Sequence, residues 1–297
     1  MITFTPPSAS LLGDLQLRYR PQRQWGQGRG ALLVLAHFLS GVGAGAWLAG
    51  SATAGFAAMV TGWSLVALGG LAHLLFLGRW SRFWRMVARP QSSWISRGLL
   101  GMSLFLLTGA AYLALAMLGD ASLGAAGPLW WLSVLGAAWV LLYKGFVWAS
   151  SKGIPFWNTP LLPPLYIAYG VRGGLAVLLL VTLATVPASQ LAAIETVKLW
   201  LGVSAALLVL IYLAVVRGTG LTAAESVHML LSGSAAGVFY AGVVVLGLLV
   251  PLGVGIYALW ALIGGPLVSA AAVASLLGDL ALIYGVARAG LYRPLPF

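Results

Sequence analysis

The sequence predicts an all-α integral membrane protein, an eight-helix transmembrane bundle. One observation behind this prediction is composition: 61% of the residues are hydrophobic, and only 7% are charged. Soluble domains carry about 25% charged residues, so this chain has too few charges to cover a water-exposed surface. The other observation is the length of the apolar runs, because a helix needs about 20 apolar residues to cross a membrane. Lipid is therefore the expected solvent for most of the surface.

The chain divides into two short polar ends and one long apolar region. We expect residues 1–30 to form a cytoplasmic N-terminal tail and residues 291–297 a cytoplasmic C-terminal tail. Residues 31–290 form the predicted eight-span transmembrane domain. Gly41 and Gly45 in its first span have a spacing that lets two membrane helices approach closely. The spans are expected at about 31–50, 53–78, 98–118, 129–150, 163–187, 197–216, 229–251 and 256–287.

The distribution of charge predicts how the chain is oriented. The net charge of +11 comes from basic residues that sit mainly at the ends of apolar runs. This pattern indicates orientation and contact with lipid headgroups rather than nucleic-acid binding. An inside N-terminus and an inside C-terminus place the basic loops 79–97, 151–162 and 217–228 in the cytoplasm, and leave Asp120 and Glu195 to the outside. A basic loop is also a suitable docking surface for a partner subunit.

The residue types that the chain lacks narrow its chemistry. It contains no cysteine, so it holds neither a disulfide nor an iron–sulfur cluster of its own. Any electrons that reach it must come from another subunit or a bound cofactor. The sequence also lacks a phosphate-binding loop, metal-ligand spacings and a nucleophile–base pair. It therefore predicts no metal site and no catalytic residue of a soluble-enzyme type.

Several polar side chains fall inside predicted spans. A charge at the centre of a span costs about 3 kcal/mol on insertion scales, so each is a functional hypothesis by default. His37 lies about two turns from the inner end of the first span, and Tyr143 and Lys144 lie at a similar depth in the fourth. Arg172 has a similar depth in the fifth span. We expect the four side chains to converge in the inner half of the membrane, above the loop 152–164.

Each of these residues also has a structural interpretation. His37 could hydrogen-bond to a neighbouring helix, and Tyr143 could belong to the aromatic belt of the membrane interface. Lys144 and Arg172 could extend to the inner surface. Asp279 is too short to do so from the eighth span, and must be either protonated or paired. The candidate proton path comprises Asp279, Arg172 and Glu195.

Four stretches, taken together, make the chain similar to one known family. The segment LGRWSRFWRM is specific, as is YKG followed by SKGIPFWNTP, and the glycine-rich HFLSGVGAGAW and the terminal AGLYRP agree with them. With these stretches the sequence resembles the NrfD/PsrC family, the quinone-interacting membrane subunits of polysulfide-reductase-like molybdoenzymes. The stretches lie at 37–47, 77–98, 143–160 and 289–294.

The resemblance implies a quinone site. In the family, a histidine of the first span and a tyrosine of the fourth are associated with the quinone headgroup, and these match His37 and Tyr143. Three positions depart from the family pattern: Leu33 replaces an asparagine, Trp80 a proline, and Lys144 a threonine. The expected quinone-binding residues are His37, Tyr143, Lys144, Trp157 and Asn158.

The resemblance also implies partners and a location. We expect a membrane anchor that exchanges electrons between menaquinone or ubiquinone and a ferredoxin-like iron–sulfur subunit, which is joined to a molybdopterin-type catalytic subunit. The complex would lie in the prokaryotic cytoplasmic (inner) membrane, and this chain would itself hold no haem or iron–sulfur cluster. The residues expected to dock the partner are Arg79, Arg82, Phe83, Trp84, Arg85 and Trp94.

Two other functions remain open from the sequence alone. One is a haem b anchor, with His37 and His73 as axial ligands. The other is an ion- or proton-translocating membrane protein, although no internal repeat typical of transporters is evident.

Overall fold

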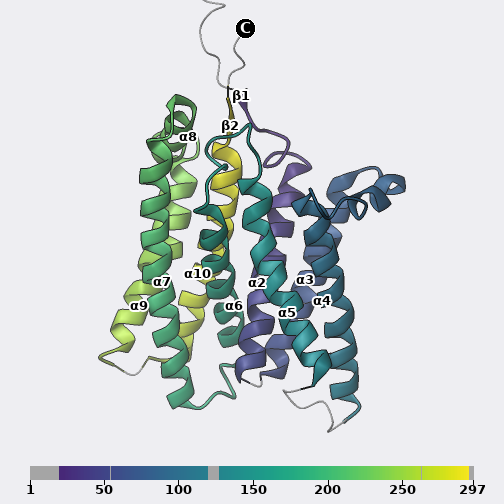
Figure 1. Ribbon diagram of the computed structural model, residues 1–297. Helices are drawn as coiled ribbons and strands as arrows, with labels where there is room; N and C mark the ends of the chain where they lie inside the picture. The colour runs from purple at the N-terminus through teal and green to yellow at the C-terminus, as the bar shows by residue number, and fades with distance from the viewer. Residues whose placement is uncertain (1–19, 54, 120–126, 262, 294–297) are drawn as a thin grey trace, which may run out of the picture.

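The computed structural model describes residues 20–53, 55–119, 127–261 and 263–293. Within these ranges, eight helices are long and apolar enough to cross a membrane, which confirms the predicted eight-helix bundle. They run alternately up and down, and the start and the end of the described chain meet at the same end of the bundle (Figure 1). Residues 1–19, in the expected N-terminal tail, and Asp120 lie outside the described ranges.

The spanning helices follow the apolar runs. They are α2 (Gly30–Thr53), α3 (Phe56–Leu77), α4 (Trp94–Met117), α5 (Pro128–Ala149), α6 (Leu162–Thr182), α7 (Ala188–Arg217), η2 (Val238–Leu249) continued by α9 (Val250–Ala258), and α10 (Gly265–Ala289). Four smaller elements sit between or beside them: η1 (Trp80–Met86), α8 (Leu221–Leu231), and the two-residue strands β1 (Arg20–Pro21) and β2 (Leu291–Tyr292).

The predicted limits of the last three spans were wrong at their starts. The sixth span begins at Ala188, about nine residues before its predicted start. Glu195 and Lys198 suggested an outer loop, but they lie inside the helix and form an ion pair with each other. The predicted start of the seventh span at 229 falls in α8, which ends before the Ser232–Ser234 turn. The predicted start of the eighth at 256 falls in α9, and α10 begins only at Gly265, with a proline in its first turn.

Glycines set how closely the central helices pack. A Cβ atom at Gly43 would collide with the backbone of α3 at Gly62, and one at Gly45 would collide with the backbone of α6 at Gly170. Helix α2 is thus held between α3 and α6, as the glycine spacing predicts for close helix contact. The seventh span has π-helical geometry at η2, where Gly247 lies directly against Gly278 of α10.

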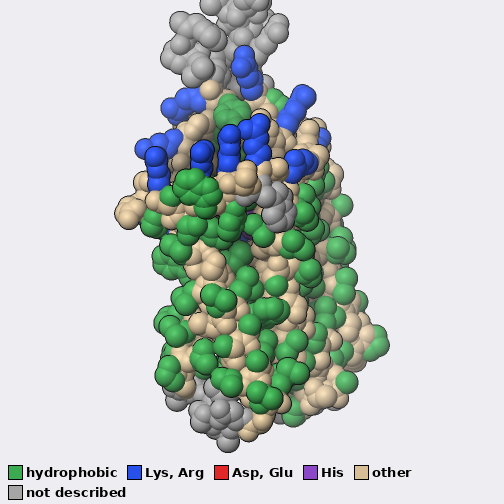
Figure 2. All heavy atoms as spheres, turned by 90° about the vertical axis from the view of Figure 1, so that its right-hand side faces the viewer, with side chains coloured by type: hydrophobic (Ala, Val, Ile, Leu, Met, Phe, Trp, Pro, Cys, Tyr) green, Lys and Arg blue, Asp and Glu red, His purple; other side chains and the backbone are tan. Residues whose placement is uncertain are grey.

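One end of the bundle is strongly basic. Every described Lys and Arg except Lys144, Arg172 and Lys198 belongs to a segment at this end. Figure 2 shows Lys and Arg side chains gathered there on one face, above an apolar flank. We call it the basic end. There β1 pairs with β2, and the backbone N–H of Gln22 donates to the carbonyl of Gly290 at 2.8 Å. The two ends of the described chain are therefore tied together.

Candidate functional site

Helices α2, α3, α4 and α5 enclose a cavity of about 410 Å³ near the basic end. Its polar side chains are chiefly His37, His73 and Tyr143, so we call it the histidine–tyrosine cavity. Most of the remaining wall is aliphatic or aromatic, and Phe83 and Met86 of η1 contribute to it from the basic end. Its size and its few polar groups are typical of sites for organic ligands.

His37 extends from α2 into this cavity. It lies seven residues from the start of α2, which is about 10 Å along the helix from the basic end. Its side chain is 2% exposed, and its ring packs against those of His73 and Trp148 at centroid distances of 5.2 and 5.6 Å. The Nδ1 atom is buried and has no hydrogen-bond partner. A buried ring nitrogen without a partner is suited to a ligand or a water molecule.

Tyr143 reaches the same cavity from α5. Its ring lies against α4 at Gly98, where a Cβ atom would overlap the ring carbons. Gly98 ends the second family-like stretch, so the structure gives that glycine a packing role. The convergence of His37 and Tyr143, predicted from their depths, is therefore found in the structure.

His73 is a cavity residue that the sequence suggested only as a haem ligand. Its Nδ1 lies 2.9 Å from the backbone oxygen of Gly69. A carbonyl oxygen can only accept, so in the neutral ring Nδ1 carries the proton and Nε2 is left as an acceptor. His73 thus supplies a fixed acceptor beside His37, and a histidine on a predicted neighbouring span was the only sequence signal for this role.

The two histidine rings are not arranged for a haem. They contact each other edge to face with an interplanar angle of 71°. Axial ligands must face each other across the porphyrin plane, and these rings leave no space for a macrocycle. The haem interpretation therefore gains no support from the geometry. Among the described residues, no group of three or more metal-ligating side chains is positioned to hold a metal ion.

Lys144 does not extend to the surface. Its ammonium donates to the backbone oxygen of His37 at 2.8 Å, and its side chain is buried. Gly41 makes room for it, because a Cβ atom there would lie 3.0 Å from the lysine Nζ. Lys144 therefore lies behind His37, on the side away from the histidine–tyrosine cavity.

Trp157 and Asn158 lie outside the histidine–tyrosine cavity. The indole N–H of Trp157 donates to the oxygen of Val286, and its ring stacks on Trp25 with a centroid distance of 5.2 Å. Asn158 lines a separate open groove between α5 and α6. Trp25, which the sequence did not single out, itself lines the cavity. Trp157 therefore contacts the cavity indirectly, through Trp25 and through Trp148, which packs on His37.

The candidate proton-path residues form two separate ion pairs. Arg172 of α6 binds Asp279 of α10 and also donates to the oxygen of Gly247 at 2.6 Å. Both charged side chains are 1% exposed, so Arg172 does not extend to the surface and Asp279 is paired. Glu195 lies inside α7 rather than in a loop, and binds Lys198 at 3.0 Å. Among the described residues, no hydrogen bond joins the two pairs.

The expected docking residues lie at the basic end. Trp84 is 62% exposed, and the guanidinium of Arg85 lies 5.5 Å from the centre of its ring. Trp94 is held between Phe146 and the guanidinium of Arg97, at 4.4 and 4.6 Å from the ring centre. The remaining members of the set, Arg79, Arg82 and Phe83, are close in sequence, at or within η1.

Comparison with known proteins gives one match over nearly the whole chain. The family described as "Polysulphide reductase, NrfD" matches residues 25–294. This range contains all of the residues that line the histidine–tyrosine cavity. None of the curated proteins matches the chain.

Proposed function

Since the chain belongs to the NrfD family of polysulphide reductase membrane subunits, we propose that it is the quinone-binding anchor of a multi-subunit oxidoreductase. It would exchange electrons between a partner's iron–sulfur centres and the quinone pool. The observation that carries this proposal is the histidine–tyrosine cavity of about 410 Å³, which is apolar apart from a few converging polar groups.

The cavity suits a quinone headgroup with a long apolar tail. Leu71 of α3 and Ile95 of α4 line it, and each is 47% exposed. The wall between α3 and α4 is therefore incompletely closed. We propose this wall as the route by which an isoprenoid quinone, menaquinone or ubiquinone, enters from the membrane.

The polar groups match the two redox states of the substrate. A quinone has two carbonyl oxygens that accept hydrogen bonds, and a quinol has two hydroxyls that donate them. The Tyr143 hydroxyl would donate to a carbonyl, and Nε2 of His73 would accept from a hydroxyl. His37 can do either, because a neutral imidazole carries one donor and one acceptor nitrogen.

Electrons must reach the cavity from another subunit, because the chain has no cysteine to hold a cluster. We propose that a ferredoxin-like iron–sulfur subunit, carrying a molybdopterin-type catalytic subunit, docks on the basic end. Arg82, Arg85 and Trp84 of η1 would contact it, together with Arg79 and Trp94, since Arg and aromatic residues are enriched at protein interfaces. Phe83 supports this site, because it belongs to η1 and also lines the cavity.

The basic end also supports a proposal for the orientation. Basic residues favour the cytoplasmic side of a membrane. We therefore propose a multi-pass protein of a prokaryotic inner membrane, with both ends of the chain and the docked partner in the cytoplasm.

The test is quinone-linked electron transfer by the assembled complex. His37→Ala and Tyr143→Phe should lower the rate at least about tenfold, while the subunits still co-purify. Tyr112→Phe is the matched control, because Tyr112 lies on α4 towards the opposite end of the bundle and packs on Trp47. Unchanged quinone kinetics in both cavity variants would contradict the assignment.

A further inference from the structure

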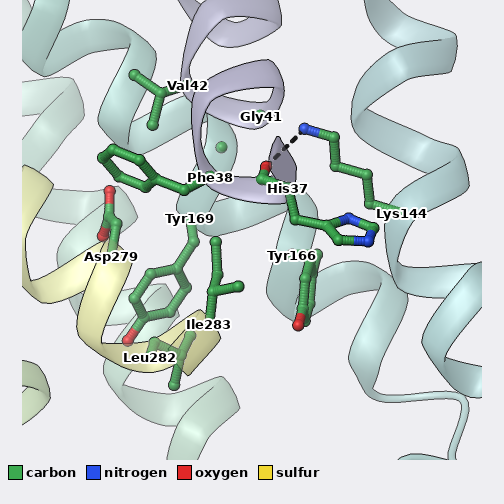
Figure 3. Close-up of a pocket in the computed structure, with 11 residues that line it drawn as sticks. His37, Phe38, Gly41, Val42, Lys144, Tyr166, Tyr169, Asp279, Leu282 and Ile283 are labelled. Carbon is green, nitrogen blue, oxygen red and sulfur yellow. Dashed lines mark hydrogen bonds between the residues drawn. The ribbon is translucent and has the colours of Figure 1, made fainter. Parts of the chain in front are cut away.

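A second, much smaller cavity lies behind His37, on the other side of α2. Its volume is about 10 Å³, and its lining includes His37, Lys144, Tyr166, Tyr169 and Asp279. Figure 3 shows these side chains around one space, with Lys144 bound to the backbone of His37 and Asp279 across from them. We call it the inner chamber. His37 lines both cavities.

The chamber and its borders hold an unusual number of buried polar atoms without partners. They are Nδ1 of His37, the hydroxyls of Tyr166 and Tyr169, Oδ2 of Asp279 and Nε of Arg172. Buried polar groups are normally hydrogen-bonded, and an unmade bond costs free energy. A space of about 10–15 Å³ accommodates one water molecule when polar partners surround it. These atoms therefore lack hydrogen-bonding partners, and the chamber has space for a water molecule beside those that face it.

We propose that the inner chamber is a hydrated proton-transfer site that connects His37 with the buried Arg172–Asp279 ion pair. The chain would then move protons within the membrane as well as bind quinone. The proposal rests on the proposed function, because quinone in the neighbouring cavity supplies or takes the proton.

The transfer is balanced as follows. When a quinol is oxidised, it loses two electrons to the partner's iron–sulfur centres and releases two protons. One proton leaves the cavity to water at the basic end. His37 takes the other on one ring nitrogen and gives up a proton from its second ring nitrogen to the chamber water. The water passes a proton to Oδ2 of Asp279, the carboxylate oxygen that Arg172 does not bind. Reduction of a quinone runs the same steps backwards.

The charges around the chamber favour passing the proton on. The α5 ammonium of Lys144 lies behind His37, so a positively charged imidazole there would face a like charge. On α10, the Asp279 carboxylate is the only described acidic group in the lining. Helix α6 adds Arg172, which holds this carboxylate, and the hydroxyls of Tyr166 and Tyr169. The Glu195–Lys198 pair is not part of the chamber, so the proposal leaves it out.

Infrared difference spectroscopy can test the chamber in the full-length chain, reconstituted in lipid nanodiscs with ubiquinone or menaquinone. Spectra are recorded as the bound quinone is reduced and reoxidised. We expect a carboxyl stretching band that changes with redox state, disappears in Asp279→Asn and shifts in Asp279→Glu. We also expect Tyr169→Phe to weaken it, because this change removes a hydroxyl of the chamber.

The test does not depend on Asp279→Asn alone. If Asp279→Asn fails to fold, Asp279→Glu and Tyr169→Phe still report on the chamber. Tyr212→Phe is the matched control, because the Tyr212 hydroxyl is buried outside the chamber and donates to the oxygen of Phe156 at 2.7 Å. Its redox difference spectrum should match that of the wild-type protein.

The outcomes separate the two proposals. If quinone binds but the carboxyl band is absent, or is unchanged in the Asp279 and Tyr169 variants, the chamber proposal is wrong and the proposed function stands. If the wild-type chain binds no quinone, the proposed function is wrong, and the chamber proposal falls with it.

Discussion

Replacing Gly98 by alanine should push Tyr143 out of its place in the cavity wall. A Cβ atom at Gly98 would overlap Cδ2 and Cε2 of the Tyr143 ring. Carbon atoms in contact are about 3.5–4.0 Å apart, so the ring must move away from α4 by more than about 1 Å. Overpacking of this kind costs about 1–3 kcal/mol. The displaced Tyr143 hydroxyl would also lose its hydrogen bond to the quinone, worth about 1.4 kcal/mol, so we expect quinone to bind about tenfold more weakly.

The assay is quinone binding, measured by quenching of tryptophan fluorescence in nanodiscs, together with the thermal unfolding midpoint. Gly101→Ala is the matched control, because its Cβ would push against Trp139, which is 38% exposed to lipid and outside the cavity. It should change stability and leave the quinone affinity as it is. In a Tyr143→Ala background, Gly98→Ala should cost little more. Wild-type quinone affinity in Gly98→Ala would refute the packing argument.

The remaining predictions concern the ion pair, the helix crossing and the second histidine. Asp279→Ala should destabilise the protein by about 3–5 kcal/mol, because it leaves the buried Arg172 charge without a partner. The double variant Arg172→Met with Asp279→Leu should be destabilised far less, because it removes both charges. Thermal unfolding midpoints of the two variants check this. Gly45→Leu should prevent the α2–α6 contact, and the variant should be lost from the membrane fraction in expression blots. His73→Phe should keep the fold but lower the quinol oxidation rate about tenfold, because one hydrogen bond worth about 1.4 kcal/mol is lost. Steady-state kinetics measure this rate.

The sequence was sufficient to predict the fold, because helices that cross a membrane need long apolar runs that are easily recognised. Long apolar runs specify helices, and the spacing of Gly41 and Gly45 predicted a close helix contact that occurs at Gly45 and Gly170. The starts of later spans were harder, because an apolar loop and an apolar helix have the same composition. The stretch between α9 and α10 is of this kind: in the sequence it belongs to one long apolar run, and only Gly264, Gly265 and Pro266 mark the start of α10.

The site was predictable where depth along a helix was enough. His37 and Tyr143 lie at similar depths from the basic end, and both line one cavity. Depth does not show which side of a helix a residue occupies, so Lys144, next in sequence to Tyr143, could not be assigned to the opposite side of His37. Trp25 was missed for another reason. Its place in the cavity depends on the pairing of the two chain ends, which leaves no local sequence pattern.

The central claim is that a quinone occupies the histidine–tyrosine cavity, and labelling with a photoreactive azidoquinone tests it most directly. After illumination of the reconstituted protein, mass spectrometry should find the label on cavity-lining segments of α3 and α4, around 67–77 and 95–106, with excess natural quinone preventing it. Label confined to the open groove beside Asn158, or spread over the lipid-facing helices regardless of competitor, would contradict the account.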